Sequence, residues 1–545
     1  MHAPRSQDEA PRTPPRREWR IALAIAVVSL ALRFLIASHC DIFQDEALYW
    51  WEAHERGVNF CPHPPAASLA VRGGLALLGD NVLGLRVASL AWGTAAILVV
   101  FALGRDLYGP RAGLWAAALF ASCPLFMGVS TITTPDSLLV LVWLLFMWAA
   151  WRAASGTGWL WWAAAGALVA AGFYTKYMMV LALPCTFLAL LASPRGRALL
   201  RRPRPWLALG LGSALFVPVF LAWNAGNDWA AIRYHLSSRH HWEFAWGDAV
   251  RYVAAHAGAI SPLTLVGVLA GFVAAWRSWR RGDWSAAWVI AFGFLPIAFF
   301  LLPSAFTRRG LMRVQWDEVG YAVGTIGFAA AVVGRTGAAG ARRAWRRLGV
   351  GALVMACAVS GALIIGSRWP RAALGLGLRA PTRQTIGWRE LAQRVREIRS
   401  SWQGEEPLIV ANSFSTLFCL AVHLHQRDGL YTLESRANVR YGLVEELGVW
   451  RVDEEHLTQR LGRSAPTLGV LFIDEHFGTD SDPWHARIPR RIRRSFASVE
   501  RLEPLVITRG GHMIKHFTLC ACRGWRGAAA PGPAETRLPV AEDAR

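Results

Sequence analysis

Acidic and basic side chains are scarce in this sequence: Asp, Glu, Lys and Arg make up 17% of its 545 residues, whereas 54% of the residues are hydrophobic. The mean hydropathy is +0.28. A chain this long and apolar does not fold as one soluble domain, because it has too little polar surface to cover its core. We predict a polytopic α-helical membrane protein. The net charge of +21 does not indicate a nucleic-acid partner, because the arginines fall mainly in short loops between apolar segments.

Further absences exclude other classes of protein. The eight cysteines show no zinc-type spacing, which excludes a metal ribbon, and the sequence contains no solenoid repeat. No small-x-small cleavage site follows Ala37, so the first apolar segment is predicted to be a retained anchor and not a secretory signal peptide. Cys40 and Cys61 could pair on an oxidising face or remain as buried thiols.

About eleven apolar segments suit membrane helices of about 20 residues, although several are short. They lie at residues 21–37, 82–103, 112–130, 137–151, 159–173, 177–192, 206–221, 252–276, 284–302, 319–333 and 348–365. Arginines concentrate in alternate loops, and Arg16, Arg17 and Arg20 precede the first segment, which places the amino end in the cytoplasm. We predict a disordered cytoplasmic tail at residues 1–20 and a transmembrane domain at residues 21–365.

One predicted outside loop breaks this charge rule. Residues 307–318 carry Arg308, Arg309 and Arg313 on the face that should be poor in arginine. Either the topology differs at this point, or these cations bind an anion such as a phosphate or an acidic lipid head group. The sequence leaves both readings open.

Residues 366–523 show a different pattern, in which polar helix-like segments alternate with apolar strand-like segments. Helices are predicted near residues 388–400 and 415–425, and strands near residues 408–411, 468–473 and 516–521. This pattern indicates a soluble α/β domain, and an odd number of spans after a cytoplasmic amino end makes that domain extracytoplasmic. Residues 524–545 are rich in Pro and Ala and are predicted to be a disordered tail.

Candidate chemistry lies at the outward-facing ends of the spans. The first outside loop, residues 39–66, holds Asp45 and Glu46 next to an aromatic run that includes Tyr49, followed by His63. Ionisable groups are costly to bury next to lipid, so this cluster points to function. Further candidates are Asp136, Lys176, and the polar stretch 223–244 with Arg239 and His240. Acids that abstract a proton and cations that stabilise a phosphate are what group transfer from a phosphate leaving group requires.

Structural explanations also exist for these residues. Asp136 could cap a helix that starts at Pro135. Lys176 could extend to the lipid head groups, and the tryptophans could form an interfacial belt. His240 and His241 could be ordinary loop residues. The acidic pair of the first loop is harder to explain in this way, because acids are seldom packed between a span and an aromatic run.

Five sequence stretches occur in order at predicted outward-facing ends: QDEALYW, CPHPPAA, TTPDSLL, YTKYMMVL and WNAGNDW, the last followed by RH. Together they resemble the membrane glycosyltransferases of the C superfamily, in particular the bacterial protein-mannosyltransferase and aminoarabinose-transferase group, which is glycosyltransferase family 39-like. The resemblance covers roughly residues 1–250 well and the rest more loosely. It implies a transferase that passes a sugar from a polyprenyl-phosphate-linked donor to an envelope lipid, glycan or protein acceptor, on the outer face of the bacterial cytoplasmic membrane.

The resemblance also implies roles for single residues. Asp45 would activate the acceptor, Glu46 would orient it or help to hold a divalent metal ion, and His63 would face the donor phosphate or that metal. Asp136 and Lys176 match the acid of the third outside turn and the lysine that contacts the donor phosphate. The predicted substrate-binding set is completed by Tyr49, Arg239 and His240.

Aminoarabinose transferases have a lysine at the position that His63 occupies here, and this difference argues against an aminoarabinose donor. The carboxy-terminal domain lacks the tandem outer-loop repeats of eukaryotic protein mannosyltransferases, so a lipid or glycan acceptor is expected more than a protein. The main rival function is a transporter or flippase for an anionic lipid. A transporter predicts charged residues at mid-depth in the spans, whereas the candidate charged residues of this sequence lie mostly at one face of the membrane. An envelope-binding module with a membrane anchor would not need so many spans.

Overall fold

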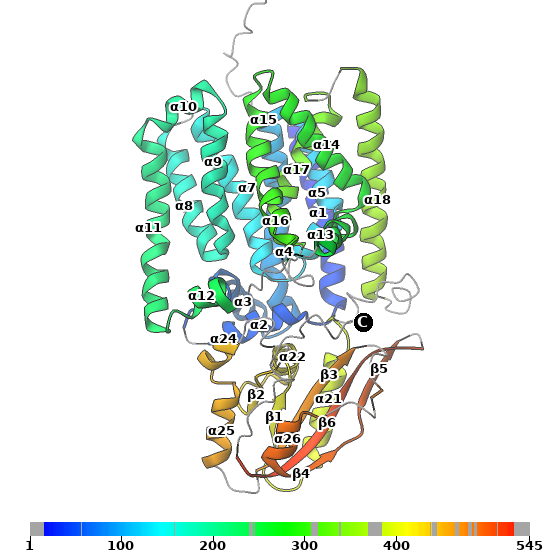
Figure 1. The fold of residues 1–545 in the computed structure, drawn as a ribbon. Helices are drawn as coiled ribbons and strands as arrows, with labels where there is room; N and C mark the ends of the chain where they lie inside the picture. The colour runs from blue at the N-terminus through cyan, green and yellow to red at the C-terminus, as the bar shows by residue number, and fades with distance from the viewer. Residues whose placement is uncertain are drawn as a thin grey trace, which may run out of the picture.

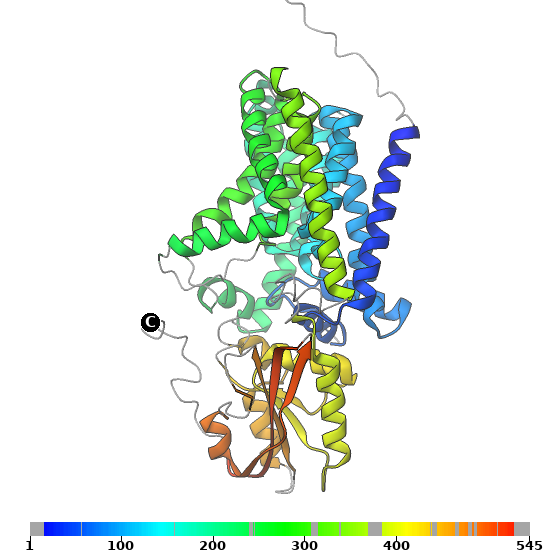
Figure 2. The same ribbon diagram turned by 90° about the vertical axis from the view of Figure 1, so that its right-hand side faces the viewer.

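The computed structural model describes residues 16–527, except for residues 56, 157, 239–243, 245, 307–313, 337–338, 369–383, 436–437, 439–443, 464–467, 478–481, 484–487 and 510. Arg239, His240 and the arginines of the loop at 307–313 therefore lie outside the described residues. The described chain forms a helical bundle with a smaller sheet domain at one end (Figure 1). Figure 2 shows that α1 (Arg16–His39) starts at the far end of the bundle and ends beside the sheet domain.

The apolar segments predicted from the sequence form the helices of the bundle. These are α1, α4 (Val82–Tyr108), α5 (Pro110–Ser122), α7 (Pro135–Ala154), α8 (Trp159–Thr175), α9 (Ala182–Leu191), α11 (Pro203–Gly226), α14 (Pro262–Trp279), α15 (Trp284–Val289) with α16 (Leu295–Ser304), α17 (Glu318–Val332) and α18 (Arg342–Arg368). Six stretches of the described chain are long and apolar enough to cross a membrane: 17–39, 82–108, 135–154, 203–226, 262–279 and 284–304. The prediction of a multi-pass helical membrane protein is confirmed.

Two predicted spans are broken in the structure. The segment predicted at 112–130 divides at Cys123 into α5 and α6 (Pro124–Val129). The segment predicted at 252–276 divides at Ser261 into α13 (Trp246–Ile260) and α14. In both cases the next helix begins with proline, which has no N–H to continue the earlier helix and suits the first position of a new one.

The first helix includes the last residues of the segment 1–20 that was predicted to be a disordered tail. α1 begins at Arg16. Trp19 packs edge-on against Phe101, with ring centroids 4.9 Å apart, and Arg105 lies over the same indole. These contacts hold the first turn of α1 against α4, so tertiary packing extends the helix into a polar segment.

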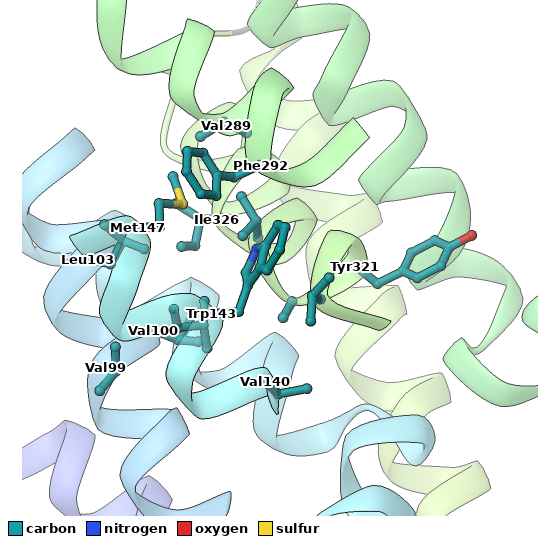
Figure 3. Close-up of a cluster of buried hydrophobic side chains, with 14 of the residues drawn as sticks. Val99, Val100, Leu103, Val140, Trp143, Met147, Val289, Phe292, Tyr321 and Ile326 are labelled. Atoms are coloured by element: carbon teal, nitrogen blue, oxygen red, sulfur yellow. The ribbon is translucent and has the colours of Figure 1, made fainter. Parts of the chain in front are cut away.

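The interior of the bundle is packed around Trp143 of α7, which is fully buried (Figure 3). Its indole meets Phe292 at a ring-centroid distance of 5.6 Å. Both rings belong to one apolar cluster with Ile326 of α17 and Val100 of α4. Close packing of this kind, more than a hydrophobic driving force, holds helices together in lipid.

The carboxy-terminal domain is built on a six-stranded sheet. Its strands are β1 (Leu408–Ala411), β2 (Leu430–Thr432), β3 (Val470–Phe477), β4 (Phe496–Arg501), β5 (Leu505–Arg509) and β6 (His512–Trp525). The order is β2-β1-β3-β6-β4, with β5 paired to β6; the first three strands are parallel, and β6 is antiparallel to its neighbours. The predicted α/β domain is confirmed, and β6 continues to Trp525, beyond the predicted start of the tail at residue 524.

Helices cover both faces of this sheet. One face packs on α21 (Trp388–Ser400) and α22 (Phe414–Leu424), and the other on α25 (Glu454–Arg463) and α26 (Arg490–Ser495). α22 also contacts α2 (Gln44–Ala53), at the junction of the two domains (Figure 1). The shorter connecting helices are α3 (Ala66–Leu78), α10 (Pro194–Leu200), α12 (Ala230–Arg233) and α24 (Val444–Val449). All eight cysteines, Cys40 and Cys61 among them, are thiols.

Candidate active site

The segment between α1 and α4 contains the short helices α2 and α3, and the predicted first outside loop at residues 39–66 is its first part. It lies at the end of the bundle that meets the sheet domain (Figures 1 and 2). The acidic pair Asp45 and Glu46 forms the first turn of α2, where the helix dipole favours negative charge. The two carboxylates predicted to be catalytic therefore start a helix at the domain junction.

Glu46 is fully buried and bound to Arg86 of α4. Arg86 Nε lies 2.8 Å from Glu46 Oε1, and Nη2 lies 2.5 Å from Oε2. The same carboxylate accepts hydrogen bonds from the backbone N–H groups of Phe43 at 3.1 Å and Thr133 at 3.2 Å. Both oxygens are thus engaged within the protein, which favours an anchoring role for Glu46 over the predicted role as a metal ligand.

Arg86 also fixes the backbone that leads to the acidic pair. It donates to the carbonyl oxygens of Ala37, Cys40 and Asp41 at 2.8, 2.9 and 3.0 Å. One guanidinium therefore holds the end of α1, the following turn and the start of α2. Removing one partner of a buried ion pair costs about 3–5 kcal/mol because the other charge is left unpaired, so the loss of Arg86 would disrupt this connection.

Asp45 differs from its neighbour because it is partly exposed. Successive residues of an α-helix are rotated by about 100°, so adjacent side chains point in different directions. Asp45 lies within electrostatic range of Cys419 on α22, which places it toward the sheet domain. Of the two acids, Asp45 is the one that a substrate can reach.

Asp136 and Lys176 form a second buried ion pair. Lys176 Nζ lies 2.5 Å from Asp136 Oδ1, and the two residues are 8% and 7% exposed. Asp136 is in the first turn of α7, and Lys176 directly follows α8. The lysine turns inward instead of extending to the head groups. Because Thr133, in the turn before α7, is bound to Glu46, this ion pair adjoins the first loop.

The segment that carries His63 is held by residues from other helix ends at the same end of the bundle. Tyr177 donates its hydroxyl to the carbonyl of Phe60, and His235 Nε2 lies 3.0 Å from the carbonyl of Pro62. His63 follows at a partly exposed position. The stretch YTKYMMVL thus binds the residue that directly precedes CPHPPAA, although the two stretches are far apart in the chain.

Sequence reasoning missed Glu318, the first residue of α17. Its side chain is fully buried and lies within electrostatic range of Asp136 and Lys176. The preceding residue, Asp317, lies 2.8 Å from His256 Nε2. The acids stand in the sequence QWDE, directly after the arginine-rich stretch, where the unusual arginines dominate the pattern. An acidic pair at the start of an apolar segment was the signal that could have identified them.

The structure also bears on the predicted metal site and on the predicted substrate-binding role of Tyr49. Among the described residues, no group of three or more His, Cys, Asp or Glu side chains is placed to hold a metal ion. Tyr49 is buried in an apolar cluster that α2 shares with the sheet domain, which favours packing over substrate binding.

Glu52 of α2 is a buried acid at the edge of the site. Burial raises its pKa to about 8 from the ordinary value of 4.5, and the charge of Glu55 acts in the same direction. Hydrogen bonds from Ser68 and Asn59 favour the ionised form but do not offset the lost hydration. Glu52 is therefore protonated at neutral pH.

Known proteins share this architecture. Residues 62–223 match the family described as dolichyl-phosphate-mannose-protein mannosyltransferase. ArnT from Cupriavidus metallidurans in the apo state superposes with a TM-score of 0.60 at 15% identity, over 91% of this chain and 97% of that one. The chain therefore has the fold of this ArnT. The same ArnT bound to undecaprenyl phosphate gives a TM-score of 0.57 at 17% identity, over the same shares of both chains.

Relatives in sequence agree with this fold. Undecaprenyl phosphate-alpha-4-amino-4-deoxy-L-arabinose arabinosyl transferase 1 of Pseudomonas fluorescens is 25% identical over 319 residues, which are 52% of this chain and 56% of that protein. Lipid A galacturonosyltransferase RgtD of Rhizobium johnstonii is 23% identical over 294 residues, 52% of this chain and 59% of that protein. The chain thus spans little more than half the length of the curated relatives it matches. The resemblance inferred from the motifs is confirmed.

We expect Glu52→Gln to change how stability depends on pH. In the folded wild type this carboxyl keeps its proton up to about pH 8, whereas in the unfolded chain it ionises near its ordinary pKa of 4.5. Between these values unfolding releases a proton, so the free energy of unfolding falls by up to about 1.4 kcal/mol per pH unit as pH rises. The glutamine variant lacks this contribution. Its thermal midpoint should therefore rise relative to wild type from about pH 5 to about pH 8.

Thermal unfolding of the detergent-purified protein across this range measures the difference. Glu405→Gln, at an exposed glutamate of the sheet domain, is the matched control. A difference between Glu52→Gln and wild type that stays constant with pH would contradict the assignment of Glu52 as a protonated acid.

Proposed function

We propose that this protein transfers a sugar from a polyprenyl-phosphate-linked donor to an envelope acceptor at the outer face of the bacterial cytoplasmic membrane. The observation that carries the proposal is the partly exposed Asp45, fixed beside the anchored Glu46, whose carboxylate binds the turn that leads to the Asp136–Lys176 pair. The names of the relatives support a lipid-linked donor, because they include undecaprenyl phosphate, and RgtD supports a lipid acceptor through its description as a lipid A transferase. A glycan or protein acceptor is the alternative.

The proposed reaction is a single displacement. Asp45 accepts the proton of an acceptor hydroxyl, whose oxygen forms a bond to the anomeric carbon. The bond from that carbon to the phosphate oxygen breaks, and its electron pair leaves with the polyprenyl phosphate. Lys176 stabilises the departing anion, as a cation next to developing charge does. One such displacement inverts the anomeric centre. Neither His63 nor Glu46 is needed as a metal ligand in this scheme.

The topology belongs to the same proposal. The amino end of α1 lies in the cytoplasm, and the sheet domain lies on the opposite, extracytoplasmic side of the membrane. Two observations support this: Arg17 and Arg20 stand at the start of α1, and that start and the sheet domain lie at opposite ends of the bundle (Figure 2).

Asp45→Asn should abolish sugar transfer, because an amide does not accept the acceptor proton. The test is a transfer assay on purified protein with a panel of polyprenyl-phosphate sugars and labelled envelope lipids. Asp428→Asn, at an exposed aspartate of the sheet domain, should keep full activity. Full transfer by a folded Asp45→Asn variant would refute the assignment. Donor movement across vesicles without transfer, in wild type and variant alike, would instead favour the transporter.

Lys176→Ala should weaken donor binding by about tenfold or more and change turnover less, because a buried cation that binds phosphate is lost. The same change leaves Asp136 unpaired in the interior, so stability must be followed by thermal unfolding. The double variant Asp136→Asn, Lys176→Met removes both charges and should regain stability without donor affinity, whereas Lys176→Arg should keep part of that affinity. An unchanged apparent donor affinity in Lys176→Ala would count against the role.

A reporter enzyme that is active only outside the cytoplasm should be active when it is fused to the carboxyl end of the full chain. The same reporter fused to the amino end should be inactive, since that end lies in the cytoplasm. The reverse result would place the sheet domain inside and overturn the topology.

A further inference from the structure

We propose that the sheet domain positions the catalytic turn, with His423 acting on Asp45 through Asp41. His423 is near the end of α22, and Asp41 lies in the turn between α1 and α2. His423 Nε2 is 2.9 Å from Asp41 Oδ1, and the two side chains are 12% and 11% exposed. This contact joins two segments that are far apart in the chain and belong to different domains.

Asp41 has a second contact to the sheet domain and one to its own turn. Arg389 Nε of α21 lies 3.6 Å from Asp41 Oδ1, and the backbone N–H of Ile42 donates to the same oxygen at 2.8 Å. Burial alone would raise the pKa of Asp41, but the contact with His423, the hydrogen bond from the Ile42 N–H and the charge of Arg389 outweigh burial and hold the pKa below its usual value. The carboxylate is therefore charged at neutral pH.

The opposite side of the same turn is held by the membrane domain. Arg86 binds the carbonyl of Asp41 and the carboxylate of Glu46. The stretch from Asp41 to Glu46, which includes Asp45, is thus held by Arg86 from the bundle and by His423 from the sheet domain. Loss of either contact frees one side of the turn that carries the proposed base.

Apolar packing makes this connection stiff. Residues 47–51 of α2 belong to one buried cluster with α21 and α22. Trp51 meets Phe418 of α22 at a ring-centroid distance of 5.3 Å. Because close-packed side chains transmit small displacements, a shift of α22 moves α2 with it. The sheet domain is therefore part of the structure that sets the catalytic geometry.

This inference rests on the proposed function, since it assigns His423 as a positioning residue for that reaction. Displacement of a catalytic group by about 1 Å can lower the rate about a hundredfold. We expect His423→Ala to lower kcat by about tenfold to a hundredfold and to leave the donor KM within about twofold, because Asp136 and Lys176 lie in the bundle. His423→Gln keeps a side-chain N–H for Asp41 and should recover most of the rate.

A double-mutant cycle tests the coupling of the two residues. Asp41→Asn should lower kcat at least as much as His423→Ala does, since it also loses the charge that pairs with Arg389, and the double variant should be no worse than Asp41→Asn alone, because the His423 contact is already lost there. The matched control is His456→Ala, which removes a histidine–aspartate pair with Asp453 inside the sheet domain, away from the turn. That control should keep the wild-type rate. Losses that add in the double variant, or an equal loss in His456→Ala, would overturn the proposal.

Hydrogen–deuterium exchange provides a readout that does not depend on activity. Backbone amides of residues 41–48 should exchange faster in His423→Ala than in wild type, and at the wild-type rate in His456→Ala, with thermal midpoints as the check on folding. If wild type transfers no sugar, the proposed function fails, and exchange still decides the coupling. Unchanged exchange in His423→Ala, or an equal rise throughout the sheet domain, would refute the positioning role.

Discussion

The ion pair between Arg86 and Glu46 is the interaction on which the rest of the site depends. Burying two charges is costly, and such a pair is tolerated when its remaining hydrogen-bonding groups are satisfied. Here the guanidinium also binds three backbone carbonyls of the α1–α2 connection, and the carboxylate also binds the N–H of Thr133 before α7. One pair therefore joins α1, α2, α4 and α7 at the end of the bundle, and Asp45 takes its position from that junction.

The two adjacent acids illustrate what the sequence could and could not predict. The motif QDEALYW and its place after the first span pointed to both Asp45 and Glu46. It could not say which one is buried, because the partner that decides this, Arg86, is forty positions away on another helix. Glu318 was missed for a related reason: its relation to Lys176 depends on the approach of α17 to α7, which no local pattern contains.

The fold was predictable to the extent that apolar composition determines it. Continuous apolar runs located the bundle helices, and buried strands such as β1 and β3 gave a clear signal. Hydropathy stayed high across Cys123 and Ser261, so the breaks there were not predicted, although proline follows each one. β4 was missed because most of its side chains are exposed or partly exposed, which removes the apolar signal of a strand. Helix α2 was not predicted, because it is buried between the two domains, a context that its sequence does not reveal.

The charged side chain of Arg33 inside the bundle is bound entirely by the protein, whereas Asp45 and His63 at the end of the bundle are partly exposed. Arg33 of α1 is 1% exposed, and its N–H groups bind backbone carbonyls of α1, of α4 and at the end of α6, together with the hydroxyl of Thr94. This guanidinium is satisfied by the protein and fixes α1 against its neighbours, so it needs no passing ion. A transport pathway requires polar groups that a substrate can contact at successive depths. Asp45 and His63, which keep partial exposure, lie instead at one end of the bundle. Reaction at a membrane face explains this distribution better than passage through the membrane does.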